Sequence, residues 1–266
     1  MASYRIGAHP YIFVQYGYDL EQQFDDVFDI VANAGYQTIE LHEPMLYVDG
    51  WKERIDNALG RTSMGLVGGS NGQPVWNTEQ YSQILSNMDD YSTRLSAFGN
   101  VICGMSCSGK RYEARTHQEN AQAVKVWCEL GEMFRDKGVT LNYHTHGEPI
   151  QDIRHVIDNV PAELVALGPD LDWLRVGGVD PVSFVEEQAN RLILLHIRDY
   201  HTGGERTEAL GEGDADYQGL GHTLETIDFQ GELVVELALP SGTKPTRPIE
   251  DLLRISREHL KETMGC

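Results

Sequence analysis

The segment VTLNYHTHGEPI (residues 139–150) joins an apolar, β-branched start to a polar end. The start predicts a short buried strand. His144, His146 and Glu148 follow within five residues, and alternation places all three on one side while the backbone stays extended. Two imidazoles and a carboxylate at a strand end suit metal binding or proton transfer, whereas a polar loop with solvated histidines is the alternative. Both interpretations stay open for this segment alone.

On both sides of this segment, short apolar runs alternate with amphipathic helical patterns. Strands are predicted over 4–9, 38–43, 63–70, 100–106, the start of 139–150, 163–172, 191–199 and 232–239, with helices over 19–34, 51–59, 77–98, 116–138, 152–160, 180–191, 219–229 and 249–264. Such a repeat predicts an α/β fold, a single (β/α)8 TIM barrel over residues 1–266. An open doubly wound sheet is the alternative, and the lack of GxGxxG at the first helix disfavours it.

The composition excludes several classes of partner. With 21 Lys and Arg against 41 Asp and Glu, the formal net charge is −20, which repels phosphate backbones, so no nucleic acid partner is expected. No apolar run is long enough for a membrane span, and the N-terminus does not resemble a secretory signal. The four cysteines lack CxxC spacing and sit in apolar or helical patterns, so we expect a reduced, cytoplasmic protein.

Polar groups follow nearly every predicted strand. In a TIM barrel the catalytic groups lie at the carboxyl ends of the strands, whereas the opposite rim serves stability. The oxygen-rich groups with one imidazole that follow strands five to eight suit Mn²⁺, Mg²⁺ or Co²⁺ better than a structural zinc ion. The residues at these ends are, in chain order, His9, Glu40, His42, Ser70, Asn71, His144, His146, Glu148, Asp170, Asp172, His196, Arg198, Asp199 and Glu236.

The motifs LNYHTHGE, LGPDLDWLRVGGVDP, ILLHIRDYH, GEGDADY and LVVEL resemble those of the xylose-isomerase-like barrels of the sugar phosphate isomerase/epimerase superfamily. That superfamily includes inosose dehydratase, ketose 3-epimerases and lyases that act on 3-keto sugars and C-glycosides. Its strands five to eight supply Glu, Asp, His and Glu to one divalent metal. The resemblance therefore implies one divalent ion, with Mn²⁺ preferred over Mg²⁺ or Co²⁺, bound by Glu148, Asp170, His196 and Glu236.

The chain departs from the family pattern at two places. Many relatives have Glu-Asn-His where this chain has Tyr-His-Thr at 143–145, so Glu148 is the preferred ligand and His144 or His146 the fallback. Many relatives also have Asp-x-x-His on strand six, where this chain has Trp173, for which stacking on a sugar becomes plausible. Asp172 competes with Asp170 as the ligand, and the family spacing to GGVDP favours Asp170.

The remaining candidates each have an ordinary structural alternative. Glu236 lies between apolar residues, where an unpaired carboxylate would be costly and a metal would offset that cost. Glu40 has the same character and is assigned as an acid or base beside the proton-transfer candidates His144 and His146. The expected substrate-binding residues, which could instead be packing or turn residues, are His9, His42, Trp76, Trp173 and Arg198. The glycine-rich loop 201–217 is expected to act as a lid.

The resemblance implies chemistry on a small carbohydrate. A metal that chelates a hydroxy-ketone acidifies the neighbouring C–H, and the resulting enediolate can lead to isomerisation, epimerisation or β-elimination. Elimination from a keto-sugar, keto-glycoside or inosose is preferred by analogy, with a sugar isomerase or ketose 3-epimerase as the alternative. An endonuclease IV-like phosphodiesterase and a non-catalytic sugar-binding barrel are remote alternatives. No membrane partner is expected, and homo-oligomerisation is left open.

Overall fold

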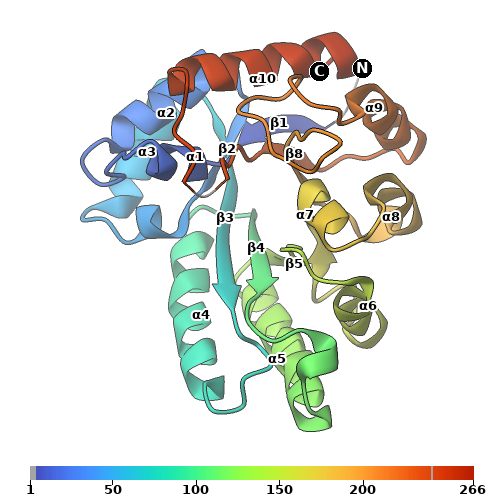
Figure 1. The fold of residues 1–266 in the computed structure, drawn as a ribbon. Helices are drawn as coiled ribbons and strands as arrows, with labels where there is room; N and C mark the ends of the chain where they lie inside the picture. The colour runs from blue at the N-terminus through green and yellow to red at the C-terminus, as the bar shows by residue number, and fades with distance from the viewer. Residues whose placement is uncertain (1–3, 241) are drawn as a thin grey trace.

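The computed structural model describes residues 4–240 and 242–266. Within these residues, eight parallel strands form one sheet in the order β6-β5-β4-β3-β2-β1-β8-β7. Isolated parallel bridges from Leu167 to Leu192 and from Asp170 to His196 join the two outer strands and nearly close the sheet. Figure 1 shows the helices arranged around the strands. The predicted (β/α)8 TIM barrel is therefore confirmed.

The strands and helices follow the predicted order along the chain. The strands are β1 (Arg5–Ala8), β2 (Thr38–Leu41), β3 (Gly65–Gln73), β4 (Val101–Cys107), β5 (Val139–Tyr143), β6 (Ala166–Leu167), β7 (Leu194–Ile197) and β8 (Glu232–Val235). The α-helices are α1 (Tyr11–Gln15), α2 (Phe24–Asn33), α3 (Trp51–Thr62), α4 (Tyr81–Ser96), α5 (His117–Asp136), α6 (Ile150–Asn159), α7 (Leu171–Val176), α8 (Pro181–Glu187), α9 (Tyr217–Thr226) and α10 (Ile249–Met264). Short 3₁₀ helices are η1 (Glu43–Leu46), η2 (Tyr112–Ala114) and η3 (Ala189–Arg191).

Local sequence explains several helix starts. Thr116 caps α5 through a capping box, in which its hydroxyl accepts a hydrogen bond from the Glu119 amide at 3.2 Å and the Glu119 carboxylate accepts one from the Thr116 amide at 2.7 Å. Asp170 caps α7 by accepting a hydrogen bond from the Trp173 amide at 3.0 Å. That cap begins a helix where the sequence predicts a continuing strand, so β6 is only two residues long.

The first predicted helix also differs from the structure. The carboxylate of Asp19 accepts hydrogen bonds from the amides of Glu21 and Gln22, which makes a turn, and α2 begins only at Phe24. The short helix α1, which carries residues of the cavity described below, was not predicted. No helix within the described ranges combines the length and apolarity needed to cross a membrane.

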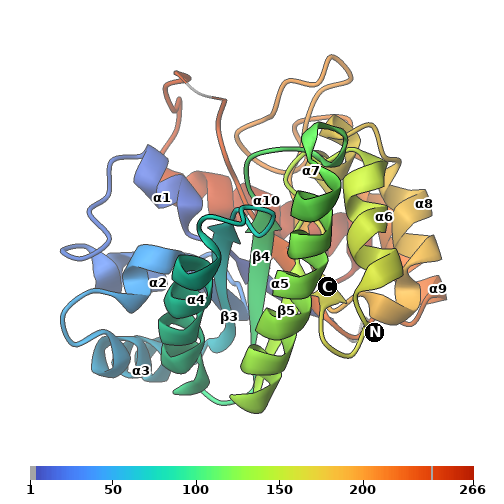
Figure 2. The ribbon, with the colours of Figure 1, turned by 90° about the horizontal axis from the view of Figure 1, so that it is seen from below.

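The barrel interior changes from apolar to polar along the strands. Leu194 and Val234 belong to a small buried apolar cluster, and two residues later the same strand faces present His196 and Glu236. In Figure 2 the arrowheads of β3 and β4 point to the end of the molecule where the loops after β7 and β8 project. The polar groups are therefore concentrated at the carboxyl end of the barrel, where TIM-barrel active sites lie.

Candidate metal centre and substrate cavity

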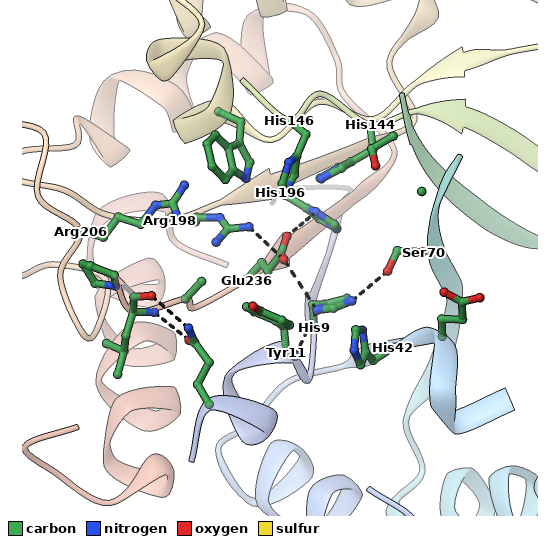
Figure 3. Close-up of a pocket in the computed structure, with 18 of the residues that line it drawn as sticks. His9, Tyr11, His42, Ser70, His144, His146, His196, Arg198, Arg206 and Glu236 are labelled. Carbon is green, nitrogen blue, oxygen red and sulfur yellow. Dashed lines mark hydrogen bonds and ion pairs between the residues drawn. The ribbon is translucent and has the colours of Figure 1, made fainter. Parts of the chain in front are cut away.

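A cavity of about 600 Å³ opens at the carboxyl end of the barrel. Its polar lining combines residues that lie on or just after β1, β2, β3, β4, β5, β7 and β8. Figure 3 shows Glu236 and His196 between two groups of imidazoles, with His144 and His146 on one side and His9 and His42 on the other. A volume of this size accommodates a small organic ligand.

Four side chains at this cavity converge on one point. His144, Asp170, His196 and Glu236 each offer one ligand atom, and these atoms all lie within 4.8 Å of one another. The four residues come from the end of β5, the start of α7, β7 and the end of β8. Three of them are the predicted ligands, and the fourth, His144, is the fallback.

The structure does not bring the preferred ligand Glu148 to this cluster. Its carboxylate is fully buried and accepts hydrogen bonds from Arg111 Nη1 at 2.8 Å and from the His146 amide. Gly147 adopts a φ of +80°, so the backbone turns after His146 and alternation no longer applies. Burial raises the pKa of the Glu148 carboxyl, and the Arg111 guanidinium opposes that shift.

His196 lies between two carboxylates. Its Nε2 is 2.5 Å from Oε2 of Glu40, and its Nδ1 is 2.9 Å from Oε2 of Glu236. The Nδ1 and Oε2 atoms of the second pair are buried and lack hydrogen-bond geometry. Burial lowers the pKa of His196, but Glu40 and Glu236 outweigh burial and raise it to about 10. This position therefore requires a positive charge, and a divalent cation meets that requirement through the four converging atoms.

Arg198 connects the two carboxylates of the cluster. Its Nε donates to Oδ2 of Asp170 at 2.6 Å, and its Nη2 lies 2.9 Å from Oε1 of Glu236. Burial raises the pKa of Glu236, but the positive charge of Arg198, together with His9 and His196, holds it well below the ordinary value. Arg198 therefore holds both carboxylates in place, and it favours the ionised form of Glu236.

The choice between Asp170 and Asp172 is resolved by geometry. Asp172 accepts hydrogen bonds from Arg175 Nη2 at 2.5 Å and from Arg206 Nε at 2.6 Å, and it is not part of the converging cluster. Asp172 instead brings Arg206 to the cavity wall.

The cavity imidazoles other than His196 favour the neutral form. The Tyr11 amide donates to Nδ1 of His9 at 3.2 Å, so the proton of neutral His9 is on Nε2, which lies 3.0 Å from the Ser70 hydroxyl. Burial lowers the pKa of His42 to about 4. Burial likewise lowers the pKa of His9, His144 and His146. At neutral pH these groups are therefore bases or neutral hydrogen-bonding partners.

The aromatic candidates differ in position. Trp173 lines the cavity, with the His146 ring centroid 4.4 Å from its own and the Arg206 guanidinium 4.4 Å from its ring. Trp76 is absent from the lining, and its indole nitrogen donates to the Ser108 carbonyl at 2.7 Å. Trp76 therefore does not line this cavity, and its expected contact with substrate stays an untested prediction.

Two further expectations also change. Glu40 contacts His196 and does not line the cavity, and this arrangement favours a role in positioning His196 over direct action on substrate. The loop after β7 is anchored, because the carboxylate of Asp199 accepts hydrogen bonds from the amides of Tyr200, Gly211, Gly213 and Ala215. Such anchoring does not suit the freely moving lid expected from its glycines.

Glu43 was not assigned a role from the sequence. It lines the cavity as the first residue of η1, next to His42. The residue is exposed, and partial desolvation raises the pKa of its carboxyl, which favours the protonated form. The segment TIELHE contains both glutamates, and Glu43 follows the predicted substrate-binding residue His42. The acid or base role was nevertheless assigned to Glu40.

Two similar proteins of known activity are inosose dehydratases. Inosose dehydratase of Clostridium perfringens is 26% identical over 155 residues, covering 50% of this chain and 51% of the relative. The Clostridium beijerinckii inosose dehydratase is 24% identical over 180 residues, covering 60% and 59%. The chain thus spans about half the length of the curated relatives it matches.

Solved structures share the fold at low identity. An L-ribulose 3-epimerase has a TM-score of 0.82 at 16% identity, covering 100% of this chain and 95% of that chain. The 3-keto-D-glucoside 4-epimerase from E. coli has a TM-score of 0.75 at 14% identity, covering 99% and 100%. A model of the xylose isomerase-like TIM barrel family matches residues 28–263, and the chain belongs to this family.

Proposed function

We propose that the protein is a divalent-metal-dependent carbohydrate enzyme that removes a proton next to a carbonyl and favours β-elimination. Its substrate would be a keto-sugar, a keto-glycoside or an inosose. The observation that carries the proposal is the convergence of His144, Asp170, His196 and Glu236 within 4.8 Å at the cavity. The similarity to inosose dehydratases, whose name describes a loss of water, supports the elimination branch.

The four converging residues would hold the cation. Two carboxylates with two imidazoles suit Mn²⁺ or Co²⁺ and are less suited to Mg²⁺, which prefers oxygen ligands. A cation at this place supplies stabilisation of negative charge on the substrate oxygens. Arg198 holds Asp170 and Glu236 in place, and Glu40 keeps the Nε2 proton of His196 away from the ligand position.

His146 is the proposed base. With His144 in the ligand set, His146 is the remaining imidazole of the segment, and it lines the cavity. Burial lowers its pKa, so it is neutral and can accept a proton at pH 7. Its ring packs against Trp173 with an interplanar angle of 38°, which restricts its orientation.

Elimination also needs an acid near the departing oxygen. His9 and His42 stand on the opposite side of the cavity (Figure 3), and Glu43, the residue after His42, also lines the cavity. The two imidazoles are neutral and the Glu43 pKa is raised by partial desolvation, so Glu43 is the proposed proton donor.

Epimerisation is the second candidate function. Imidazoles stand on both sides of the cluster, with His146, the proposed base, opposite His9, whose Nε2 carries a proton (Figure 3). Removal of a proton on one side and its return on the other would invert a carbon without loss of a group.

One experiment separates these outcomes. The protein is purified without chelator, its metal content is measured, and inososes, 3-keto sugars and ketoses are assayed with Mn²⁺ and with EDTA. We expect bound metal, an unsaturated ketone from the first two classes, and loss of turnover in EDTA. Glu236→Gln should lose both metal and turnover, whereas the exposed Glu225→Gln should retain both. Ketose epimers without an unsaturated product would favour the second candidate, and metal-free active protein would contradict the proposal.

A further inference from the structure

A second, apolar groove lies beside the cavity. It has a volume of about 390 Å³ and is formed by α1 with the segment that follows it and by η1 with the segment that follows it. Its apolar and aromatic lining consists of Val14, Tyr18, Leu20, Pro44, Tyr47 and Val48.

The groove contains large apolar side chains that are exposed to solvent. Among residues 4–240 and 242–266, four large apolar side chains are exposed, and two of them, Val14 at 41% and Tyr47 at 44%, line the groove. Exposed apolar side chains that gather in a concavity next to a polar site are typical of a ligand subsite.

His42 is the wall that the groove and the cavity share. On its cavity side, its ring centroid lies 5.7 Å from that of His9 and 5.8 Å from that of Tyr11. A ligand seated in the cavity with a substituent that extends past His42 would place that substituent in the groove. Glu43, the proposed acid, is the next residue along the chain and would lie near the bond between the two parts.

The aromatic and acidic residues of the groove indicate which kind of substituent it would bind. The two aromatic walls are fixed, because Tyr18 packs edge-on against Phe13 at 5.1 Å and the Arg94 guanidinium lies 4.4 Å from the Tyr47 ring. Asp19 and Glu21 also line the groove, and their negative charge disfavours a phosphate or carboxylate there. A neutral aromatic group therefore complements this surface.

We propose that the groove binds the aromatic leaving group of a glycoside whose oxidised sugar occupies the cavity. This inference rests on the proposed function and makes a keto-glycoside the preferred substrate class. In the reaction, the proton next to the keto carbonyl is removed, a carbon–carbon double bond forms, and the bond from the sugar carbon to the glycosidic oxygen breaks. The departing oxygen gains a proton and leaves as a phenol, so the step needs no oxidant or reductant.

Equilibrium binding tests the groove without turnover. Phenyl β-D-glucopyranoside and methyl β-D-glucopyranoside, neither of which is a keto-sugar, are titrated into the metal-loaded protein by calorimetry. We expect the phenyl compound to bind about tenfold more tightly, because the ring buries apolar surface in the groove. Val14→Asp should abolish this preference, and Tyr47→Ser should reduce it. Val182→Asp on α8, whose parent residue is 37% exposed, is the matched control and should keep it.

The outcomes separate the groove from the proposed function. Equal binding of the two glucosides, or a phenyl preference that survives both groove variants, overturns the inference. Inosose turnover, which does not use the groove, tests the proposed function independently. If the groove is covered by a second copy of the chain, Val14→Asp will lower the sedimentation coefficient and no phenyl preference will be seen, which also overturns the inference. Circular dichroism establishes that each variant is folded.

Discussion

Glu40 and His196 meet inside the barrel, with Oε2 of Glu40 2.5 Å from Nε2 of His196, although 156 residues separate them in the chain. Both side chains are almost fully buried. A carboxylate on one imidazole nitrogen fixes the tautomer and leaves the other nitrogen free to bind a metal. Here the free nitrogen is Nδ1, which points at Glu236. The pair therefore links strand β2, which contributes no ligand, to the candidate metal centre.

The first prediction concerns this pair. Glu40→Gln should weaken Mn²⁺ binding by about 10–100-fold, because an outer partner of a metal-binding histidine is lost while its volume is kept. Calorimetric titration of the metal-free protein measures the effect. Glu53→Gln, at an exposed position of α3, is the control. Unchanged Mn²⁺ affinity in Glu40→Gln would show that the carboxylate does not orient His196.

The second prediction distinguishes His144 from Glu148 as the ligand. His144→Ala should weaken Mn²⁺ binding by more than the about 10–100-fold expected for an outer partner. Glu148→Gln should retain the metal but lower the free energy of unfolding by about 1–3 kcal/mol, because the charged hydrogen bond from Arg111 is weakened. The exposed His222→Ala serves as the control. The reverse pattern, with metal lost only in Glu148→Gln, would restore the ligand set implied by the family resemblance.

The barrel could be predicted from local patterns, and three of the four converging residues could be predicted from the family resemblance together with their places at strand ends. Alternation along β7 and β8 is enough to place His196 and Glu236 at the carboxyl end on the inner face. The position of Glu148 could not be predicted, because it depends on the turn at Gly147 and on Arg111, which lies 37 residues earlier in the chain.

The roles of other residues depend on contacts across the barrel. The sequence predicts that Glu40 is a buried acid but does not indicate its partner. The contact with His196 arises only when the sheet forms the barrel. Trp76 follows β3 as a substrate-binding residue would, but a hydrogen bond to the Ser108 carbonyl holds it outside the cavity. Glu43 was missed because its place at the cavity depends on the η1 turn, which no periodicity indicated.

The third prediction concerns the anchored loop after β7. Asp199→Asn should free the segment around Gly211 and Gly213, because an amide cannot accept all the backbone hydrogen bonds that the carboxylate accepts. Hydrogen exchange of residues 211–215 should become faster. KM should rise more than kcat falls, because the same loop carries Arg206 to the cavity wall. Asp228→Asn, in the α9–β8 turn, is the control. Unchanged exchange would show that the loop is held by other contacts.

The last prediction tests whether Glu43 donates the proton during elimination. Glu43→Gln keeps the shape of the side chain but removes its acidic proton. The elimination rate should fall by about 10²–10⁴-fold for a poor leaving group such as an alcohol or water. The loss should be much smaller for a nitrophenol, which departs without help. Partial desolvation raises the Glu43 pKa, so the protonated form persists to higher pH than for an ordinary glutamate. Activity of the wild-type protein should fall as the pH rises through this raised pKa, and the variant should lack that decline. An equal loss for both leaving groups, with the pH profile unchanged, would assign the proton transfer to His9 or His42.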